Sequence, residues 1–132
     1  MKDSPIAIQT TSRLSFDEAV ARAREAIAKE GMGVLTEIDV AATLKRKLDV
    51  DRPPYLILGA CHPPSAHRAL SAVPEVGTLL PCNVTVSVED GVTVVRAMDP
   101  GAVMAVLDSP ALAEVGTEIA AKLRRVVEAC RG

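Results

Sequence analysis

Two cysteines carry the most specific chemical signal in the chain. Cys61 ends the apolar segment 55–61, and Cys82 opens the alternating segment 82–88. If the two strands pair antiparallel, both thiols lie at the same edge of a sheet as a cysteine pair. The helix that begins at Pro63 directs the positive end of its dipole to the same region. This dipole favours a thiolate or a bound anion, so we expect the functional site at this edge.

Four polar residues are expected to complete the site. The candidate ligand-binding residues are Cys61, His62, Cys82, Asn83, Glu37 and Asp39. His62 contributes an imidazole, which can donate or accept a hydrogen bond. Glu37 and Asp39 can act as an acid and a base, although Asp39 also suits the cap of a following helix.

Three classes of function fit these residues. The leading hypothesis is a homodimeric binding module that holds a small ligand, an anion or a soft metal beside the thiols. A thiol-redox enzyme or a sulfur carrier would use Cys61 or Cys82 as the nucleophile, which requires an exposed thiol of low pKa. A purely structural or interaction domain would bury both, because Cys82 is in phase with Val84 and Val86 on an apolar face.

Known catalytic and cofactor motifs do not distinguish these classes. Zinc sites commonly contain CxxC or HxxxH spacing, and neither occurs here, so no metal ligands are assigned. Two thiolates would instead suit copper(I). The sequence contains no GxGxxG, P-loop or GxSxG motif, so no cofactor and no catalytic residues are assigned. The sequence does not identify an enzyme.

Composition limits the class of protein and its partners. The 132 residues fit one domain, 1–132, and 48% are apolar. A net charge of -2, with Phe16 and Tyr55 as the only aromatic residues, indicates no nucleic-acid partner. No apolar segment approaches the roughly 18 residues of a membrane span, so no membrane association is expected. Three cysteines without CxxC spacing indicate a reducing compartment, and we expect a soluble, cytoplasmic protein.

Hydrophobic periodicity predicts strands that alternate with helices. The predicted order is strand, helix, strand, helix, strand, helix, hairpin, helix, with strands at 6–11, 32–38, 55–61, 82–88 and 92–98. We expect the helix that begins at Pro63 to bury Ala66, Leu70 and Val73. Capping residues predict further helix starts after Ser15, in a capping box with Glu18, and after Asp39, Asp99 and Ser109. The last helix is expected to bury the stripe Leu112, Val115, Ile119, Leu123, Val126 and Cys130. The fold class is α+β: a largely antiparallel or mixed sheet of about five strands, with helices mainly on one face, as in ferredoxin-like domains.

One-sided coverage of the sheet has a consequence for assembly. The strand 55–61 is apolar at every position, which is typical of a strand covered on both faces. Helices on one face leave the other face open, so we expect a homodimer in which the second copy covers it.

Four segments together resemble the domain-of-unknown-function 302 family. They are 33–39, 55–61 with its end Leu58-Gly59-Ala60-Cys61, 79–84, and 98–100. The resemblance runs over nearly the whole chain and implies a small α+β domain, commonly dimeric, without an established biochemical role. The chain departs from the family pattern at His62, where Asn usually follows the cysteine and would cap the helix.

Overall fold

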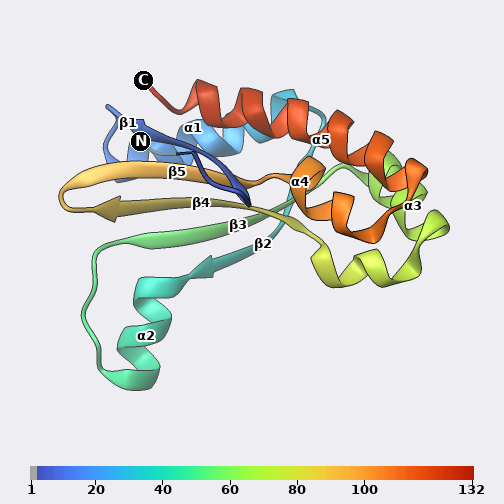
Figure 1. Cartoon of the computed structure of the whole chain (residues 1–132). Coiled ribbons are helices and arrows are strands. Elements are labelled where there is room, and N and C mark those ends of the chain that lie inside the picture. The colour runs from blue at the N-terminus through green and yellow to red at the C-terminus, as the bar shows by residue number, and fades with distance from the viewer. Residues whose placement is uncertain (1–2) are drawn as a thin grey trace.

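The computed structural model describes residues 3–132 and contains one five-stranded antiparallel sheet. The spatial order of the strands is β1-β5-β4-β3-β2 (Figure 1). The strands are β1 (Ala7–Ser12), β2 (Gly33–Asp39), β3 (Tyr55–Cys61), β4 (Cys82–Glu89) and β5 (Val92–Met98). The structure confirms the predicted α+β fold. The apolar segment 55–61 forms an interior strand, β3, between β2 and β4, but the middle strand of the five is β4.

The helices begin where the sequence predicts them. They are α1 (Phe16–Lys29), α2 (Val40–Leu48), α3 (Pro63–Ala72), α4 (Pro100–Met104) and α5 (Pro110–Ala129), with 3-10 segments η1 (Pro74–Leu79) and η2 (Ala105–Leu107). Ser15 and Glu18 form the expected capping box of α1. The side chains of Asp39, Asp99 and Ser109 accept hydrogen bonds at the starts of α2, α4 and α5. Within residues 3–132, none of these helices is long and apolar enough to cross a membrane.

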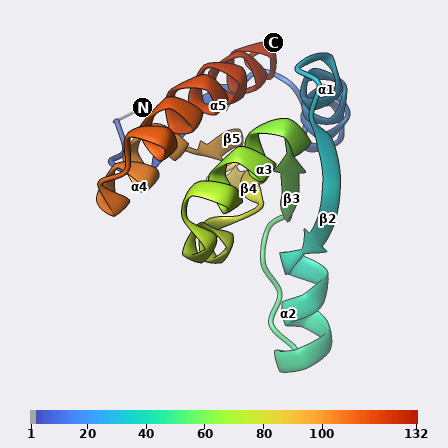
Figure 2. The same ribbon diagram turned by 90° about the vertical axis from the view of Figure 1, so that its right-hand side faces the viewer.

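Helices α1 and α5 cover one face of the sheet and enclose the core (Figures 1 and 2). Leu58, Val84 and Val95 face this layer and are fully buried. The predicted apolar stripe of α5, which Cys130 continues just after the end of the helix, is buried throughout: Leu112, Val115, Ile119, Leu123, Val126 and Cys130. Alternation along the strands leaves the other residues on the opposite face of the sheet.

The buried side of α3 differs from the prediction. Ser65 and Ala69 are each 1% exposed, whereas Leu70 is 41% exposed and Ala66 and Val73 are half-buried. The helix is thus rotated by one residue from the face that apolar periodicity favours. A serine can occupy the buried position because its hydroxyl is hydrogen-bonded there to Glu118.

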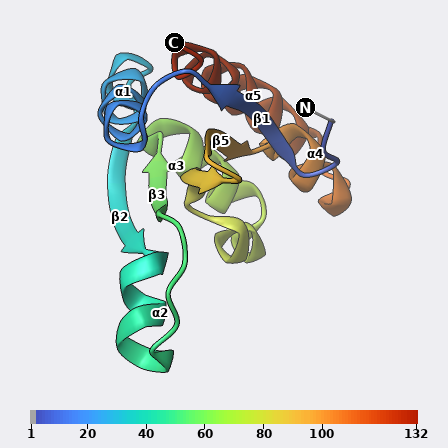
Figure 3. The ribbon, with the colours of Figure 1, turned by 90° about the vertical axis from the view of Figure 1, so that its left-hand side faces the viewer.

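The opposite face of the sheet has a polar centre. Arg96 forms an ion pair with Glu89 and donates from Nε to Gln9 Oε1 at 2.8 Å. The hydrogen bonds of Arg96, followed by that of Ser87, lower the pKa of Glu89 to about 2. Helix α2 projects away from the other helices (Figures 2 and 3) and contains no buried residue.

Gly59 has no room for a side chain at the centre of β3. A Cβ there would lie 2.1 Å from Oγ1 of Thr36 and 2.7 Å from Cγ of Pro81. We expect Gly59→Ala to lower the free energy of unfolding by about 1–3 kcal/mol, because the stiff proline ring cannot move aside. Urea denaturation checks this, with Gly33→Ala as the control, since a Cβ at Gly33 meets nothing within 4 Å. Equal urea midpoints for the two variants would contradict the steric crowding at Gly59.

Candidate functional site

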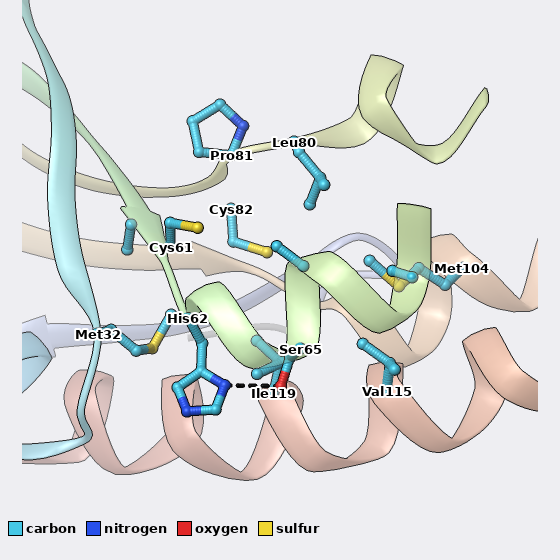
Figure 4. Close-up of a pocket in the computed structure, with 13 residues that line it drawn as sticks. Met32, Cys61, His62, Ser65, Leu80, Pro81, Cys82, Met104, Val115 and Ile119 are labelled. Carbon is cyan, nitrogen blue, oxygen red and sulfur yellow. Dashed lines mark hydrogen bonds between the residues drawn. The ribbon is translucent and has the colours of Figure 1, made fainter. Parts of the chain in front are cut away.

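A small pocket lies where β3 ends and β4 begins, against α3 and α5 (Figure 4). Its walls are mainly aliphatic. The exceptions are the sulfur-containing and polar residues Met32, Cys61, Cys82, Met104, His62 and Ser65. The pocket has a volume of about 20 Å³. A single water molecule needs roughly 10–15 Å³ of such space. The interior therefore admits one small group and not a whole organic molecule.

The sheet register brings Cys61, His62 and Cys82 to this pocket, as the sequence predicts. Cys82 lies directly opposite Ala60, so Cys61 is its diagonal neighbour. The expected cysteine pair is nevertheless wrong, because all three cysteines are free thiols. The two cysteines are diagonal rather than directly opposite neighbours, and although both line the pocket, no bond joins their sulfur atoms.

Burial makes two of the three thiols poor nucleophiles. Desolvation, with a smaller contribution from nearby Cys61, raises the pKa of Cys82 to about 11. Burial also raises the pKa of Cys130 to about 11. Cys61 is half-buried and lines the pocket, so it is the more accessible thiol.

The other three candidate residues lie outside the pocket. Because β2 runs antiparallel to β3, Gly33 lies opposite Cys61, and Asp39 lies opposite Leu56 towards the other end of β3. Glu37 instead forms an exposed 2.6 Å ion pair with Arg24.

The other two candidates, Asp39 and Asn83, lie at the start of α2 and in β4. Asp39 accepts a 2.9 Å hydrogen bond from the backbone N–H of Ala42, so it caps α2 as its position suggests. Asn83 lies opposite Gly59 and is exposed.

A hydrogen-bond network beside His62 was not foreseen from the sequence. His62 Nδ1 lies 2.6 Å from Ser65 Oγ, and Ser65 Oγ donates to Glu118 Oε1 at 3.2 Å. Arg68 pairs with the same carboxylate. The one sequence signal is that Ser65 occupies the third position of a helix whose preceding residue is His62. Nothing local points to Glu118, which comes from α5.

The described residues do not form a conventional metal site. Among residues 3–132, no group of three or more His, Cys, Asp or Glu side chains is placed to hold a metal ion. Met32 and Met104 also lie at opposite ends of the pocket (Figure 4).

Thiol labelling tests the ranking of the cysteines. At pH 8, only about one in 1,000 thiols of pKa 11 is ionised. We therefore expect iodoacetamide to modify Cys61 more than about tenfold faster than Cys82 or Cys130 in the native protein. Peptide mass spectrometry measures the three rates. Denaturant should equalise them, and Cys61→Ser should remove the fast phase; fast native labelling of Cys82 would contradict the burial argument.

Comparison with known proteins agrees with this fold. The family model described as "Domain of unknown function DUF302" matches residues 8–130. A crystal structure of an uncharacterized conserved DUF302 protein from Bacillus stearothermophilus is 30% identical, with a TM-score of 0.88 over 95% of this chain and 98% of that one. No curated protein matches the chain. The chain therefore belongs to the DUF302 family.

Proposed function

We propose that this domain is a homodimeric binding module that takes the uncharged, apolar end of a small molecule into the pocket beside Cys61. The observation that carries the proposal is the pocket itself: a cavity of about 20 Å³ with mainly aliphatic and sulfur-containing walls. Apolar walls with a few polar groups at one side are typical of small-molecule sites. The polar groups here are the thiols, His62 and Ser65.

The same pocket is a poor match for an anion or a metal. Burial raises the pKa of Cys82 to about 11, which indicates surroundings that disfavour negative charge. A soft metal would need thiolates, and forming one at Cys82 is costly. Thioether ligands offer little help, because Met32 and Met104 do not converge (Figure 4). An uncharged group meets neither difficulty.

Methionine methyl groups report directly on this site. Met32 and Met104 line the pocket, whereas Met98 belongs to β5 and does not. We expect diethyl ether to shift the ¹³C-methyl resonances of Met32 and Met104 but not of Met98. The Kd should be on the order of 1 mM, because only a few heavy atoms are enclosed. Shifts caused by acetate and not by ether would overturn the proposal for an uncharged ligand.

A matched pair of variants separates pocket filling from a change in α3. Ala66 lines the pocket, and Ala72 is exposed at the end of the same helix. Ala66→Leu should abolish the ether-induced shifts, and Ala72→Leu should preserve them. If both variants keep the shifts, the ligand binds elsewhere.

The homodimer is supported by where apolar surface remains exposed. Eight large hydrophobic residues are exposed among the described ones, and four lie in or just after β2 and α2: Leu35, Ile38, Leu48 and Val50. The register irregularity between Val34 and Thr36 makes β2 a poor edge for adding another strand. A second copy packed on the open face and α2 would cover these side chains.

A charge placed on this surface should dissociate the dimer. Ile38 is 48% exposed opposite Ile57, whereas Val106 is 83% exposed in η2. We expect Ile38→Glu to give a monomer at micromolar concentration and Val106→Glu to remain dimeric, as measured by light scattering after gel filtration. A monomeric wild-type protein at that concentration would remove the dimer from the proposal.

A further inference from the structure

A second hollow, larger than the pocket beside Cys61, lies at the C-terminal end of α5. Its volume is about 500 Å³, and its walls come from the end of β1, from α1, from the start of β5 and from the end of α5. Figures 1 and 3 show this end of α5 beside α1 and the chain that leaves β1. The two cavities share no residue. Ile119, which lines the pocket, lies roughly 15 Å along α5 from Ala129, which lines the hollow.

Three arginines from separate parts of the chain line this hollow: Arg13 just after β1, Arg22 in α1 and Arg131 just after α5. Arg22 Nη1 donates to Ala129 O at 2.9 Å, which holds this guanidinium at the end of α5. Arg131 Nη1 donates to Glu128 Oε1 at 3.0 Å. The backbone N–H of Arg13 donates to Arg131 O at 2.9 Å, so these two residues are neighbours in space.

The carbonyl end of α5 does not require all three guanidinium groups. Helix C-termini attract cations, and Arg22 binds one carbonyl there. The Ser12 hydroxyl donates to Cys130 O, and the backbone of Arg13 serves the next carbonyl. Within residues 3–132, the Arg13 side chain makes no hydrogen bond or ion pair. One guanidinium is thus enough for the helix end.

Most hydrogen-bond donors of the three arginines are therefore available to a ligand. A guanidinium has five N–H donors, and the described residues engage one Nη of Arg22 and one of Arg131. The pair of Arg131 with Glu128 is weak, because the two side chains are 61% and 68% exposed. Glu128 and a carboxylate at Gly132 carry two negative charges against three positive ones, so the hollow has a net positive charge.

We propose that this hollow, which we call the arginine hollow, binds a small molecule with at least two anionic groups, phosphate or carboxylate. The planar fork of a guanidinium matches the oxygens of either group. Val92 and Ala129 provide an apolar wall for the rest of the molecule. The volume falls within the roughly 300–1,000 Å³ that is typical of small-molecule sites. The proposal is independent of the pocket beside Cys61.

An NMR titration at constant low ionic strength tests the ligand class. We expect pyrophosphate to shift the Nε–H resonances of Arg13 and Arg22 with a Kd on the order of 1 mM, because the site is open to water. Acetate, which has one charge, should bind at least about tenfold more weakly. Citrate distinguishes the two acid groups: the tighter of citrate and pyrophosphate identifies carboxylate or phosphate. Equal affinities for pyrophosphate and acetate overturn the proposal.

The methionine methyl groups show whether the anion is in the right cavity. Met32 and Met104 line the pocket beside Cys61 and not the arginine hollow. Their ¹³C-methyl resonances should therefore stay in place when pyrophosphate is added. Saturable shifts of these two methyl groups by pyrophosphate would place the anion in the other pocket and overturn the proposal.

A matched pair of arginine variants separates a built site from general attraction by net charge. Arg124 is exposed on α5, does not line the hollow and, like Arg13, has no side-chain partner among residues 3–132. Arg13→Gln should weaken pyrophosphate binding about fivefold, the factor of one net hydrogen bond. Arg124→Gln should weaken it less than about twofold, because its charge lies outside the site and is screened. Equal weakening by the two variants contradicts the proposal.

Removal of the competing carboxylate should strengthen binding. Glu128→Gln releases Arg131 and removes a negative charge from the hollow. We expect pyrophosphate to bind this variant about threefold more tightly than the wild-type protein. Glu114→Gln removes an equal charge from an exposed position of α5 outside the hollow and should have less than half of this effect. A Glu128→Gln protein that binds no more tightly than Glu114→Gln overturns the proposal.

Discussion

The antiparallel pairing of β3 with β4 is the constraint on which the pocket depends. With Cys82 opposite Ala60, the end of β3 and the start of β4 must meet at one edge of the sheet. The chain leaves β3 directly into α3, so His62 and Ser65 arrive at the same edge. A shift of this register by one residue would exchange the two faces of β4 and move Cys82 out of the core.

Strand alternation also determines the chemistry that the edge supports. It buries Cys82 under the helices, where a thiolate is disfavoured, and leaves Cys61 half-buried. The pocket between them is consequently apolar, with its polar groups concentrated at His62 and Ser65. An edge that had suggested reactive thiols is better suited to hold an uncharged group beside a fixed imidazole.

What the sequence predicted correctly was local. Ser15, Asp99 and Ser109 mark helix starts because their side chains bond to backbone groups two or three residues away. Apolar alternation similarly predicted the strands. The prediction failed where a distant partner decides the outcome: burial of Ser65 depends on Glu118, which is 53 residues away. Likewise, the register of β2 against β3, rather than any motif, places Glu37 and Asp39 away from the pocket.

The residue at position 62 shows how the helix start and the site are connected. An Asn, which the resemblance to the family leads us to expect here, would cap α3, whereas the His62 side chain makes no such bond. The lost cap matters less here than at an ordinary helix, because Pro63 and Pro64 occupy the first two positions and have no N–H to satisfy. Position 62 is therefore free to carry a side chain that bonds to the Ser65 hydroxyl instead. The prolines thus permit an imidazole where a cap would otherwise be required.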